Sequence, residues 1–188
     1  MEDAVTLPNM GAIPESDEVE LVRRAPVDAG AFAELYRRYL PRVYRYVRAR
    51  LRNSDEAADV TQHVFLKASE ALPRYRDHGA PFAAWLFRIA RNTAIDNERR
   101  RRVTVPWESL AEIPAPDDVE AGAIDHERYA RLYALLRELS SDERELLALR
   151  FAGGLTSKEI ASVVGASDAA VKKRLARTIQ KLKERYGD

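Results

Sequence analysis

The chain holds no cysteine among its 188 residues. This absence excludes disulfide bonds, thiolate metal ligands and a cysteine nucleophile, and it suits a protein of the reducing cytosol. The chain also lacks an apolar run of about 18 residues. No basic and apolar leader stands at the N-terminus. We therefore expect a cytoplasmic protein with no direct membrane insertion.

Signatures of catalysis are also missing. His63, His78 and His126 stand at no metal-ligand spacing, and the sequence has neither a glycine-rich phosphate loop nor a GxSxG nucleophile motif. Acidic residues occur throughout, but they form no convergent acid–base set in the sequence. These gaps predict that the protein is not an enzyme and needs no cofactor or metal.

Charge is balanced overall but unevenly distributed. The chain has 31 Lys and Arg against 30 Asp and Glu, so its net charge alone indicates no nucleic-acid partner. Residues 103–127, however, contain seven acids and no Lys or Arg. This acidic stretch separates the tract Arg99–Arg102 from residues 172–185, which carry seven bases and one acid. The sequence therefore predicts two basic surfaces joined by an acidic segment.

Apolar residues in the N-terminal half recur at spacings of three and four, which predicts amphipathic helices. Ser and Pro residues mark where these helices begin. The expected segments are a flexible lead-in at residues 1–17 and a three-helix domain at residues 18–102, with helices starting near Phe32, at the cap Ser54 and at Pro81.

The C-terminal half begins after a proline-containing stretch, residues 103–123, which we interpret as an irregular acidic linker. Residues 124–188 then show helical periodicity, two capping boxes and a glycine turn. The boxes are Ser140 with Glu143 and Thr156 with Glu159, and Gly165 gives the turn before a last helix capped by Ser167. No strand is predicted, so the expected fold class is all-α, with two small helical domains joined by the linker.

The segment LTSKEIASVVGASDAAVKKRL, residues 155–175, is typical of a helix-turn-helix. Its second helix would enter the major groove of DNA, where basic side chains neutralise phosphates and arginine can bond guanine. A solvated helix face is the weaker reading. The residues expected to point outward are Asp168, Ala169, Lys172, Lys173, Arg174 and Arg177.

A second candidate site is the segment FAAWLFRIARNTAIDNERRRR. It predicts a basic helix whose apolar side carries a tryptophan, and the preceding YRDHGAP loop offers groups that could hold an unstacked base. A plain solvated helix over a core tryptophan fits equally well. The polar residues are Arg88, Arg91, Asn92, Asp96 and Arg99 on the helix, and Tyr75, Arg76, Asp77 and His78 on the loop.

The segment DEAADVTQHVFLKA gives a third candidate surface. It combines acidic and apolar side chains in a way that suits a partner protein, although a solvated helix face is an equal alternative. The acidic and polar residues lie opposite Val60 and Val64, and two apolar residues lie between the faces. The set comprises Asp55, Glu56, Asp59, Gln62, His63, Phe65 and Leu66.

These segments, together with FAELYRRYLPRVYRYVRARL and RELLALRFAGG, occur in an order that resembles the sigma-70 family of RNA polymerase sigma factors. The resemblance is to the small extracytoplasmic-function (ECF) group, which keeps only regions 2 and 4, and it covers residues 18–102 and 124–186. It implies a transcription initiation factor that binds core RNA polymerase, directs it to promoters and promotes DNA melting. It also implies an anti-sigma factor as a partner.

The resemblance assigns roles residue by residue. The polymerase-binding residues would be Asp59, Gln62, His63, Phe65 and Leu66. Contacts with the minus-ten element, partly as an opened strand, would come from Arg76, Asp77, His78, Phe82, Trp85, Arg88, Asn92, Asp96, Arg99 and Arg100. The minus-thirty-five element would be read by Ser167, Asp168, Ala169, Lys172, Lys173, Arg174 and Arg177.

Three residues depart from the family pattern. His63 stands where an acid is usual, Ala170 where Thr or Ser is frequent, and Lys173 where a small polar residue is frequent. The competing prediction is a two-domain helix-turn-helix regulator that does not bind core polymerase. Such a regulator has no need of Trp85 and Asn92 on a basic helix beside an exposed loop.

Overall fold

The computed structural model describes residues 15–51, 53–75, 81–104 and 131–187. Every regular element in this part of the chain is helical, as the sequence predicted. Residues 1–14 of the expected lead-in, loop residues Arg76, Asp77 and His78, and the linker from residue 105 onward lie outside the described residues. The elements are α1 (Glu15–Arg24), α2 (Ala29–Arg50), α3 (Ser54–Ala71), the 3-10 turn η1 (Leu72–Arg74), α4 (Phe82–Thr104), a helical stretch at 131–137, α6 (Ser141–Leu147), the π-helical turn η3 (Ala148–Ala152), α7 (Ser157–Val164) and α8 (Asp168–Gly187).

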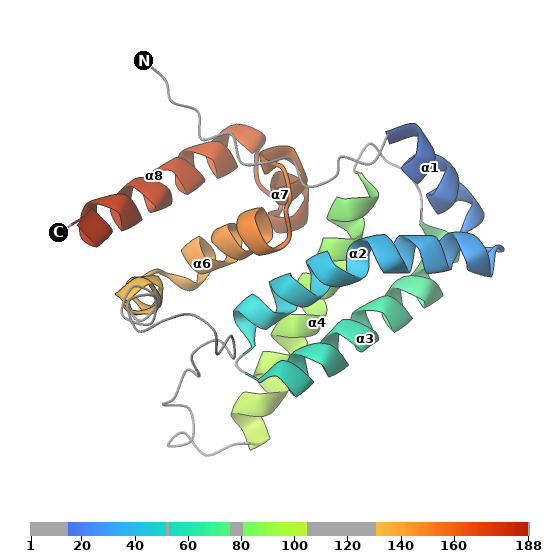
Figure 1. Cartoon of the computed structure of the whole chain (residues 1–188), viewed down its shortest axis with the longest axis horizontal. Helices are drawn as coiled ribbons and strands as arrows, with labels where there is room; N and C mark the ends of the chain where they lie inside the picture. Colours follow the sequence, from blue (N-terminus) through green and yellow to red (C-terminus); the bar gives the residue numbers. More distant parts are fainter. Residues whose placement is uncertain (1–14, 52, 76–80, 105–130, 188) are drawn as a thin grey trace, which may run out of the picture.

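The N-terminal unit, residues 15–104, is built around α2. Its buried residues, including Leu35, Tyr39 and Val43, repeat at the spacing of one helix face. Helices α1 and α3 pack on α2, and α4 packs on both α2 and α3 (Figure 1). The sequence pattern therefore predicted the core face of α2 correctly.

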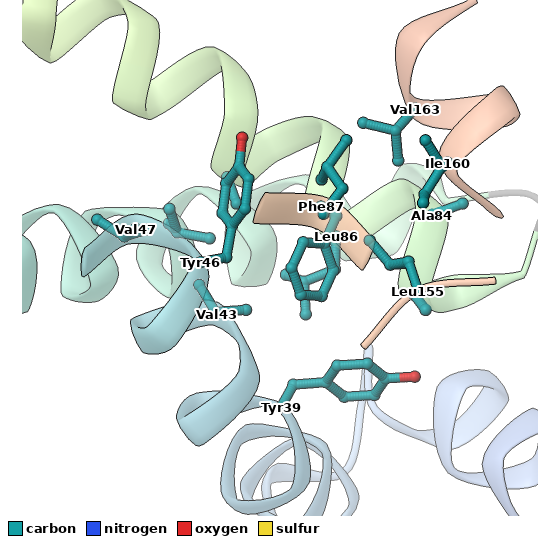
Figure 2. Packing of buried hydrophobic residues seen from close by; sticks show 14 of the residues in the cluster. Tyr39, Val43, Tyr46, Val47, Ala84, Leu86, Phe87, Leu155, Ile160 and Val163 are labelled. Atoms are coloured by element: carbon teal, nitrogen blue, oxygen red, sulfur yellow. The ribbon is translucent and has the colours of Figure 1, made fainter. Parts of the chain in front are cut away.

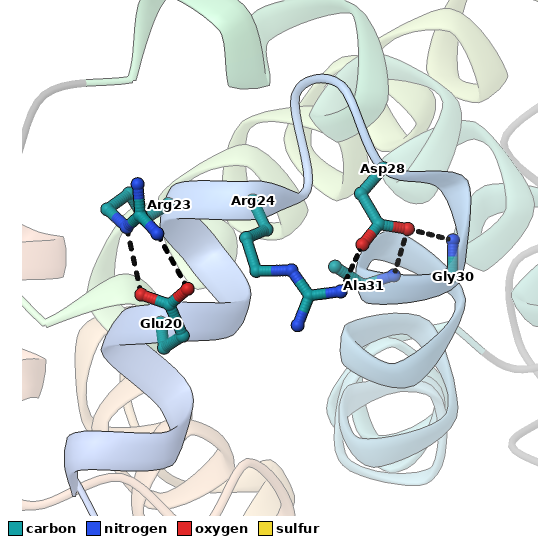
Figure 3. Close-up of polar contacts among 6 residues, drawn as sticks. All are labelled: Glu20, Arg23, Arg24, Asp28, Gly30 and Ala31. Carbon is teal, nitrogen blue, oxygen red and sulfur yellow. Dashed lines mark hydrogen bonds and ion pairs between the residues drawn. The ribbon is translucent and has the colours of Figure 1, made fainter.

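Asp28 fixes the turn between α1 and α2. Its carboxylate accepts hydrogen bonds from the backbone N–H groups of Gly30 at 2.8 Å and Ala31 at 3.2 Å, and it pairs with Arg24 (Figure 3). The Arg24 guanidinium, helped by the N–H of Ala31, lowers the pKa of Asp28. The carboxylate satisfies orphan donors at the start of α2, which explains why this helix begins before the expected Phe32.

The cap of α3 differs from the expected one. The side chain of Asn53, and not that of Ser54, accepts hydrogen bonds from the N–H groups of Asp55 at 2.7 Å and Glu56 at 3.1 Å. Ser54 is the first residue of the helix itself. Asn and Ser are equally good caps, and the helix takes the one that stands a residue earlier.

The C-terminal unit, residues 131–187, follows its local signals closely. Both predicted capping boxes are formed, at Ser140 with Glu143 and at Thr156 with Glu159. Gly165 ends α7 with a φ of 70°, a left-handed conformation that a side chain disfavours. The Ser167 hydroxyl oxygen accepts from the N–H of Ala170 at 3.2 Å and so caps α8.

The two units are in direct contact, although the sequence suggested separate lobes. Helix α7 packs on α4, and η3 packs on α2. Buried side chains from both units form one apolar cluster, in which Phe87 meets Leu155 and Ile160 (Figure 2). Helix α8 lies on the side of the C-terminal unit turned away from α2 and α3 (Figure 1). Apolar surface on α4 that α2 and α3 leave uncovered is thus buried by the C-terminal unit.

Gly153 lies at the tightest point of this contact. A Cβ atom at Gly153 would come within 2.7 Å of Phe87 Cε1 and 2.8 Å of the Leu149 carbonyl oxygen. Both distances are shorter than carbon and oxygen atoms tolerate, so the ring of Phe87 requires a residue without a side chain here.

Replacing Gly153 with Ala should therefore weaken the packing between the two units. We expect the free energy of unfolding to fall by about 1–3 kcal/mol, the usual result of overpacking a filled core. Urea denaturation followed by circular dichroism measures it. Gly30→Ala is the control, because its only near atom is an Asp28 side-chain oxygen at 3.1 Å and no ring or backbone atom crowds it. Equal stability of Gly153→Ala and the wild type would contradict the tight approach.

Candidate nucleic-acid and polymerase interfaces

Helix α8 presents a basic face to solvent. Its apolar residues Val171 and Leu175 are buried against α6 and α7, which turns the opposite side outward. Lys172 pairs with Asp168 at 2.7 Å, and Arg174 pairs with Asp142 at 3.1 Å. Among the described residues, neither Lys173 nor Arg177 has an ion pair. The residues of the expected recognition face that are exposed are Ser167, Ala169, Lys172, Lys173, Arg174 and Arg177, while Asp168 is half-buried.

Helix α4 carries the second predicted face, and neighbouring side chains and α7 cover part of it. Trp85 is half-buried beneath Tyr75, whose ring centroid is 5.0 Å away. Arg88 is exposed, yet its guanidinium donates to the Ser162 carbonyl oxygen of α7 at 2.8 Å. The remaining described members are Asn92, Arg99 and Arg100, which are exposed, and Asp96, which is half-buried.

Phe82, one of the residues that the resemblance assigns to the minus-ten element, is buried at the start of α4. It is only 5% exposed and lies against the rings of Tyr39 and Tyr75, with centroids 5.4 Å and 5.9 Å away. An aromatic ring at the start of α4 fills the space above α2 better than it would face water. In this arrangement Phe82 anchors α4 and offers no surface to a base.

Most of the side chains expected on the α3 surface are exposed, and the exceptions are Glu56 and Phe65. Glu56 is half-buried and accepts a hydrogen bond from the Asn97 side chain at 2.6 Å. Asp59, Gln62, His63 and Leu66 are exposed and line a shallow hollow, and Leu66 leaves 56% of its surface in solvent. Phe65 instead is 5% exposed and packs on Tyr36, with ring centroids 4.6 Å apart. Phe65 therefore supports the surface from below because its side of the helix faces α2.

The units are joined by arginines that reach across the contact. Arg42 of α2 donates from Nε to the Gly153 carbonyl oxygen at 2.9 Å and from Nη2 to that of Gly154 at 3.2 Å. Its guanidinium also lies 5.0 Å from the ring centroid of Tyr39. Arg88 makes the equivalent bridge from α4 to Ser162. Backbone oxygens of the C-terminal unit thus satisfy cations of the N-terminal unit.

Glu145 of α6 is the centre of this contact. Only 7% exposed, it accepts a hydrogen bond from the Tyr46 hydroxyl at 2.7 Å. It pairs with Arg50, and Arg91 Nε lies 3.5 Å from its Oε1. Burial raises the pKa of Tyr46 to about 12, so its hydroxyl keeps the proton that it donates. A buried carboxylate is tolerated only with such partners.

Sequence reasoning missed this cluster, although a signal was present. Glu145 stands four residues before the buried Leu149, on the same side of its helix, where an apolar residue is usual. Tyr46 likewise stands on the apolar stripe of α2. A charged residue in a core position indicates a buried partner, but its spacing does not identify that partner.

In the described part of the chain, no helix combines the length and apolarity required to cross a membrane. Within the same residues, no three His, Cys, Asp or Glu side chains gather closely enough to hold a metal ion.

Comparison with known families agrees with the resemblance noted from the motifs. Residues 35–104 match the family described as Sigma-70 region 2, and residues 129–182 match Sigma-70, region 4. The first match spans α2 to α4, and the second spans the helix-turn-helix.

Individual relatives carry the same description. The ECF RNA polymerase sigma factor SigD of Mycobacterium tuberculosis strain H37Rv is 38% identical over 164 residues, which cover 84% of this chain and 77% of the relative. ShbA of Streptomyces griseus, also an ECF sigma factor, is 35% identical over 177 residues, covering 87% and 92%.

Solved structures share the arrangement of helices. CnrH in complex with the cytosolic domain of CnrY matches with a TM-score of 0.65 and 27% identity, over 90% of this chain and 96% of that one. RpoE of Bartonella quintana in complex with the anti-sigma factor NepR matches with a TM-score of 0.65 and 25% identity, over 82% and 95%. The chain belongs to the sigma-70 family of RNA polymerase sigma factors, in its extracytoplasmic-function group.

Proposed function

We propose that this chain is a cytoplasmic transcription initiation factor that binds core RNA polymerase, directs it to specific promoters and promotes DNA melting. The observation that carries the proposal is the division of exposed surface among three helices. Cationic faces lie on α4 and α8, and a mixed acidic and apolar face lies on α3. The chain would act by binding alone and would catalyse no reaction.

Helix α8 is suited to the minus-thirty-five element. Its N-terminal turns can enter the major groove of duplex DNA, where Lys173 and Arg177 would contact phosphates or base edges. Both side chains are exposed in the present arrangement. Ala170, also exposed, has no hydroxyl to offer a phosphate, so Lys173 would supply the missing contact through its charge.

Helix α4 is suited to the minus-ten element. Unstacking a base costs a few kcal/mol, and the free energy of binding the unstacked base must offset this cost. Trp85 and Asn92 offer stacking and hydrogen bonding to an opened strand, and Arg99 and Arg100 would neutralise nearby phosphates. The loop residues Arg76, Asp77 and His78 complete this proposed site.

The α3 hollow is suited to core polymerase. An exposed apolar side chain, Leu66, rimmed by Asp59, Gln62 and His63 has the make-up of a small protein interface with an apolar centre and a polar edge. His63, in place of the usual acid, would change the charge complementarity of this contact.

An anti-sigma factor is a further proposed partner. CnrH and RpoE, which share this fold, were solved as complexes with the cytosolic domain of CnrY and with the anti-sigma factor NepR. We extend the relation to this chain and propose a protein inhibitor that covers its DNA-binding and polymerase-binding surfaces.

The proposed function is tested by transcription in vitro. Purified core polymerase with this chain should start RNA synthesis from a subset of promoters in a genomic library, while core polymerase alone should not. A helix-turn-helix regulator would instead bind DNA without polymerase and would not co-elute with it. Failure to associate with core polymerase together with specific DNA binding would favour that alternative.

Substitutions in α8 test the minus-thirty-five face. Replacing Lys173 or Arg177 with Ala should each reduce the slope of log affinity against log salt by about 1, since each removes one phosphate contact. Fluorescence anisotropy with duplex promoter DNA over a salt series measures this slope. Lys183→Ala is the charge-matched control, because Lys183 is exposed in the last turns of the same helix. An equal effect of the control would show that only net charge matters.

A substitution in α3 tests the polymerase face. Leu66→Ala should weaken binding to core polymerase roughly tenfold, which corresponds to losing one buried apolar anchor. Surface plasmon resonance with immobilised core polymerase gives the affinity. Leu132→Ala removes the same kind of side chain from the C-terminal unit, where Leu132 is 38% exposed, and should leave the affinity unchanged. Unaltered binding by Leu66→Ala would place the interface elsewhere.

A further inference from the structure

Acidic side chains from one short segment pair with basic side chains along one side of α8. Helix α6 packs on α8 (Figure 1), and the pairs follow the two stretches of chain in opposite directions. They are Arg174 with Asp142 at 3.1 Å, Lys181 with Glu143 at 3.8 Å, and Arg185 with Glu138. The three cations stand seven and four residues apart, so they share one side of the helix. The protein itself neutralises this side of α8.

The neighbouring side of α8 carries cations without such acids. Lys173 and Arg177 are exposed, and neither forms an ion pair with a described residue. Arg174 follows Lys173 directly, about 100° further round the helix. It therefore lies at the border between the exposed cations and the paired ones. Within the described residues, Arg174 is the expected DNA-reading cation that an acid of another helix holds.

The pair between Arg174 and Asp142 orients a side chain more than it stabilises the fold. The two side chains are 44% and 74% exposed, and ion pairs in water contribute little to folding stability. The guanidinium Nη2 of Arg174 donates to Asp142 Oδ2. This planar group carries further N–H donors in a fixed arrangement. Arg174 can thus keep its contact with Asp142 while it donates to an acceptor outside the protein.

Glu143 adds to the negative charge beside Arg174. Hydrogen bonds from Ser140, with the Lys181 and Arg174 cations nearby, lower the pKa of the Glu143 carboxyl. The group is therefore ionised at neutral pH, as an ordinary aspartate such as Asp142 is. A phosphate brought to this edge of α8 would be repelled by two carboxylates, whereas the edge of a base carries no net charge. The surroundings of Arg174 favour a base over a phosphate.

We propose that Asp142 positions Arg174 for reading the minus-thirty-five element: its carboxylate directs the guanidinium to a base edge and disfavours contact with phosphate. The proposal rests on the proposed function in assigning α8 to duplex DNA. Arginine bonds guanine through two donors in one plane, so its orientation decides what it can recognise. Lys173 and Arg177 would supply affinity, and Arg174 held by Asp142 would supply sequence discrimination.

Binding to two duplexes tests this role. The probes are a fluorescent promoter duplex from the transcription assay and the same duplex with a scrambled minus-thirty-five element, each titrated with the full chain. Asp142→Ala should reduce the ratio of the two affinities about tenfold, because an oriented arginine–guanine contact is lost. For the scrambled duplex, the slope of log affinity against log salt should steepen by about 1, because the released Arg174 gains a phosphate.

Three further variants make the result specific. Glu138→Ala is the charge-matched control, since Glu138 pairs with Arg185 near the end of α8, and it should leave the ratio unchanged. Asp142→Glu keeps a carboxylate and should keep most of the wild-type ratio. In an Arg174→Ala background, Asp142→Ala should change the ratio no further, because the two residues act as one unit. Urea denaturation should give the same midpoint for Asp142→Ala and the wild type.

The positioning can also be measured without DNA. Nuclear magnetic resonance relaxation gives the order parameter of the Nε–Hε group of each arginine. The order parameter of Arg174 should fall in Asp142→Ala, while that of Arg177, which has no ion pair with a described residue, should stay the same. Equal order of Arg174 in the variant and the wild type would overturn the proposal.

The outcomes in DNA binding separate this proposal from the proposed function. A discriminating wild type with an unchanged ratio in Asp142→Ala, or with an equal fall in Glu138→Ala, would overturn the role of Asp142 alone. A parallel loss of both affinities in Asp142→Ala would also overturn it, since a merely structural residue acts in that way. A wild type that binds both duplexes equally would refute the assignment of α8 to the minus-thirty-five element, and the role of Asp142 with it.

Discussion

The carboxylate of Glu145 lies where the two helical units meet, and its surroundings determine how they are joined. Tyr46 and Arg50 from α2 and Arg91 from α4 converge on this single side chain of α6. Removing water from charged groups offsets most of their attraction, so the cluster orients the two units more than it stabilises their contact. The contact is stabilised mainly by the apolar packing beside it, where Phe87 lies against the backbone of Gly153. The arrangement of the whole molecule depends on this combination.

Signals between neighbouring residues predicted the helices and their ends well. A capping box needs only residues three apart, and both predicted boxes are formed. The left-handed turn at Gly165 is likewise a local property of a residue without a side chain. The one misplaced cap, at Ser54, follows Asn53, a residue of equal capping strength, and nothing local distinguishes the two. Caps and turns were therefore largely predictable from local signals, whereas α1 and the first turn of α2 were not expected.

Contacts between distant residues were beyond the same reasoning. Tyr46 and Glu145 are 99 positions apart, and helical periodicity gives the side on which each lies but not what covers it. Phe82 and Phe65, which the resemblance assigns to interfaces, are both buried, because each fills a space beside a tyrosine of α2. Leu66 and Phe65 were both expected between the two faces of α3, and of the two only Leu66 is exposed. The direct packing of the two units could not be predicted, since no motif in either half indicates it.

The two helices proposed to meet DNA differ in accessibility, and the difference follows from how each is packed. Helix α8 buries one apolar side against α6 and α7 and leaves its cations in solvent. Helix α4 is packed on α2 and α3 on one side and on α7 on another, so its arginines lie within reach of backbone oxygens. Arg88 of α4 would have to leave the Ser162 carbonyl oxygen to contact a strand, whereas Lys173 and Arg177 of α8 are exposed without such a partner among the described residues. Under the proposed function, α8 can meet duplex DNA in the packing described here, whereas α4 shares part of its cationic face with the C-terminal unit.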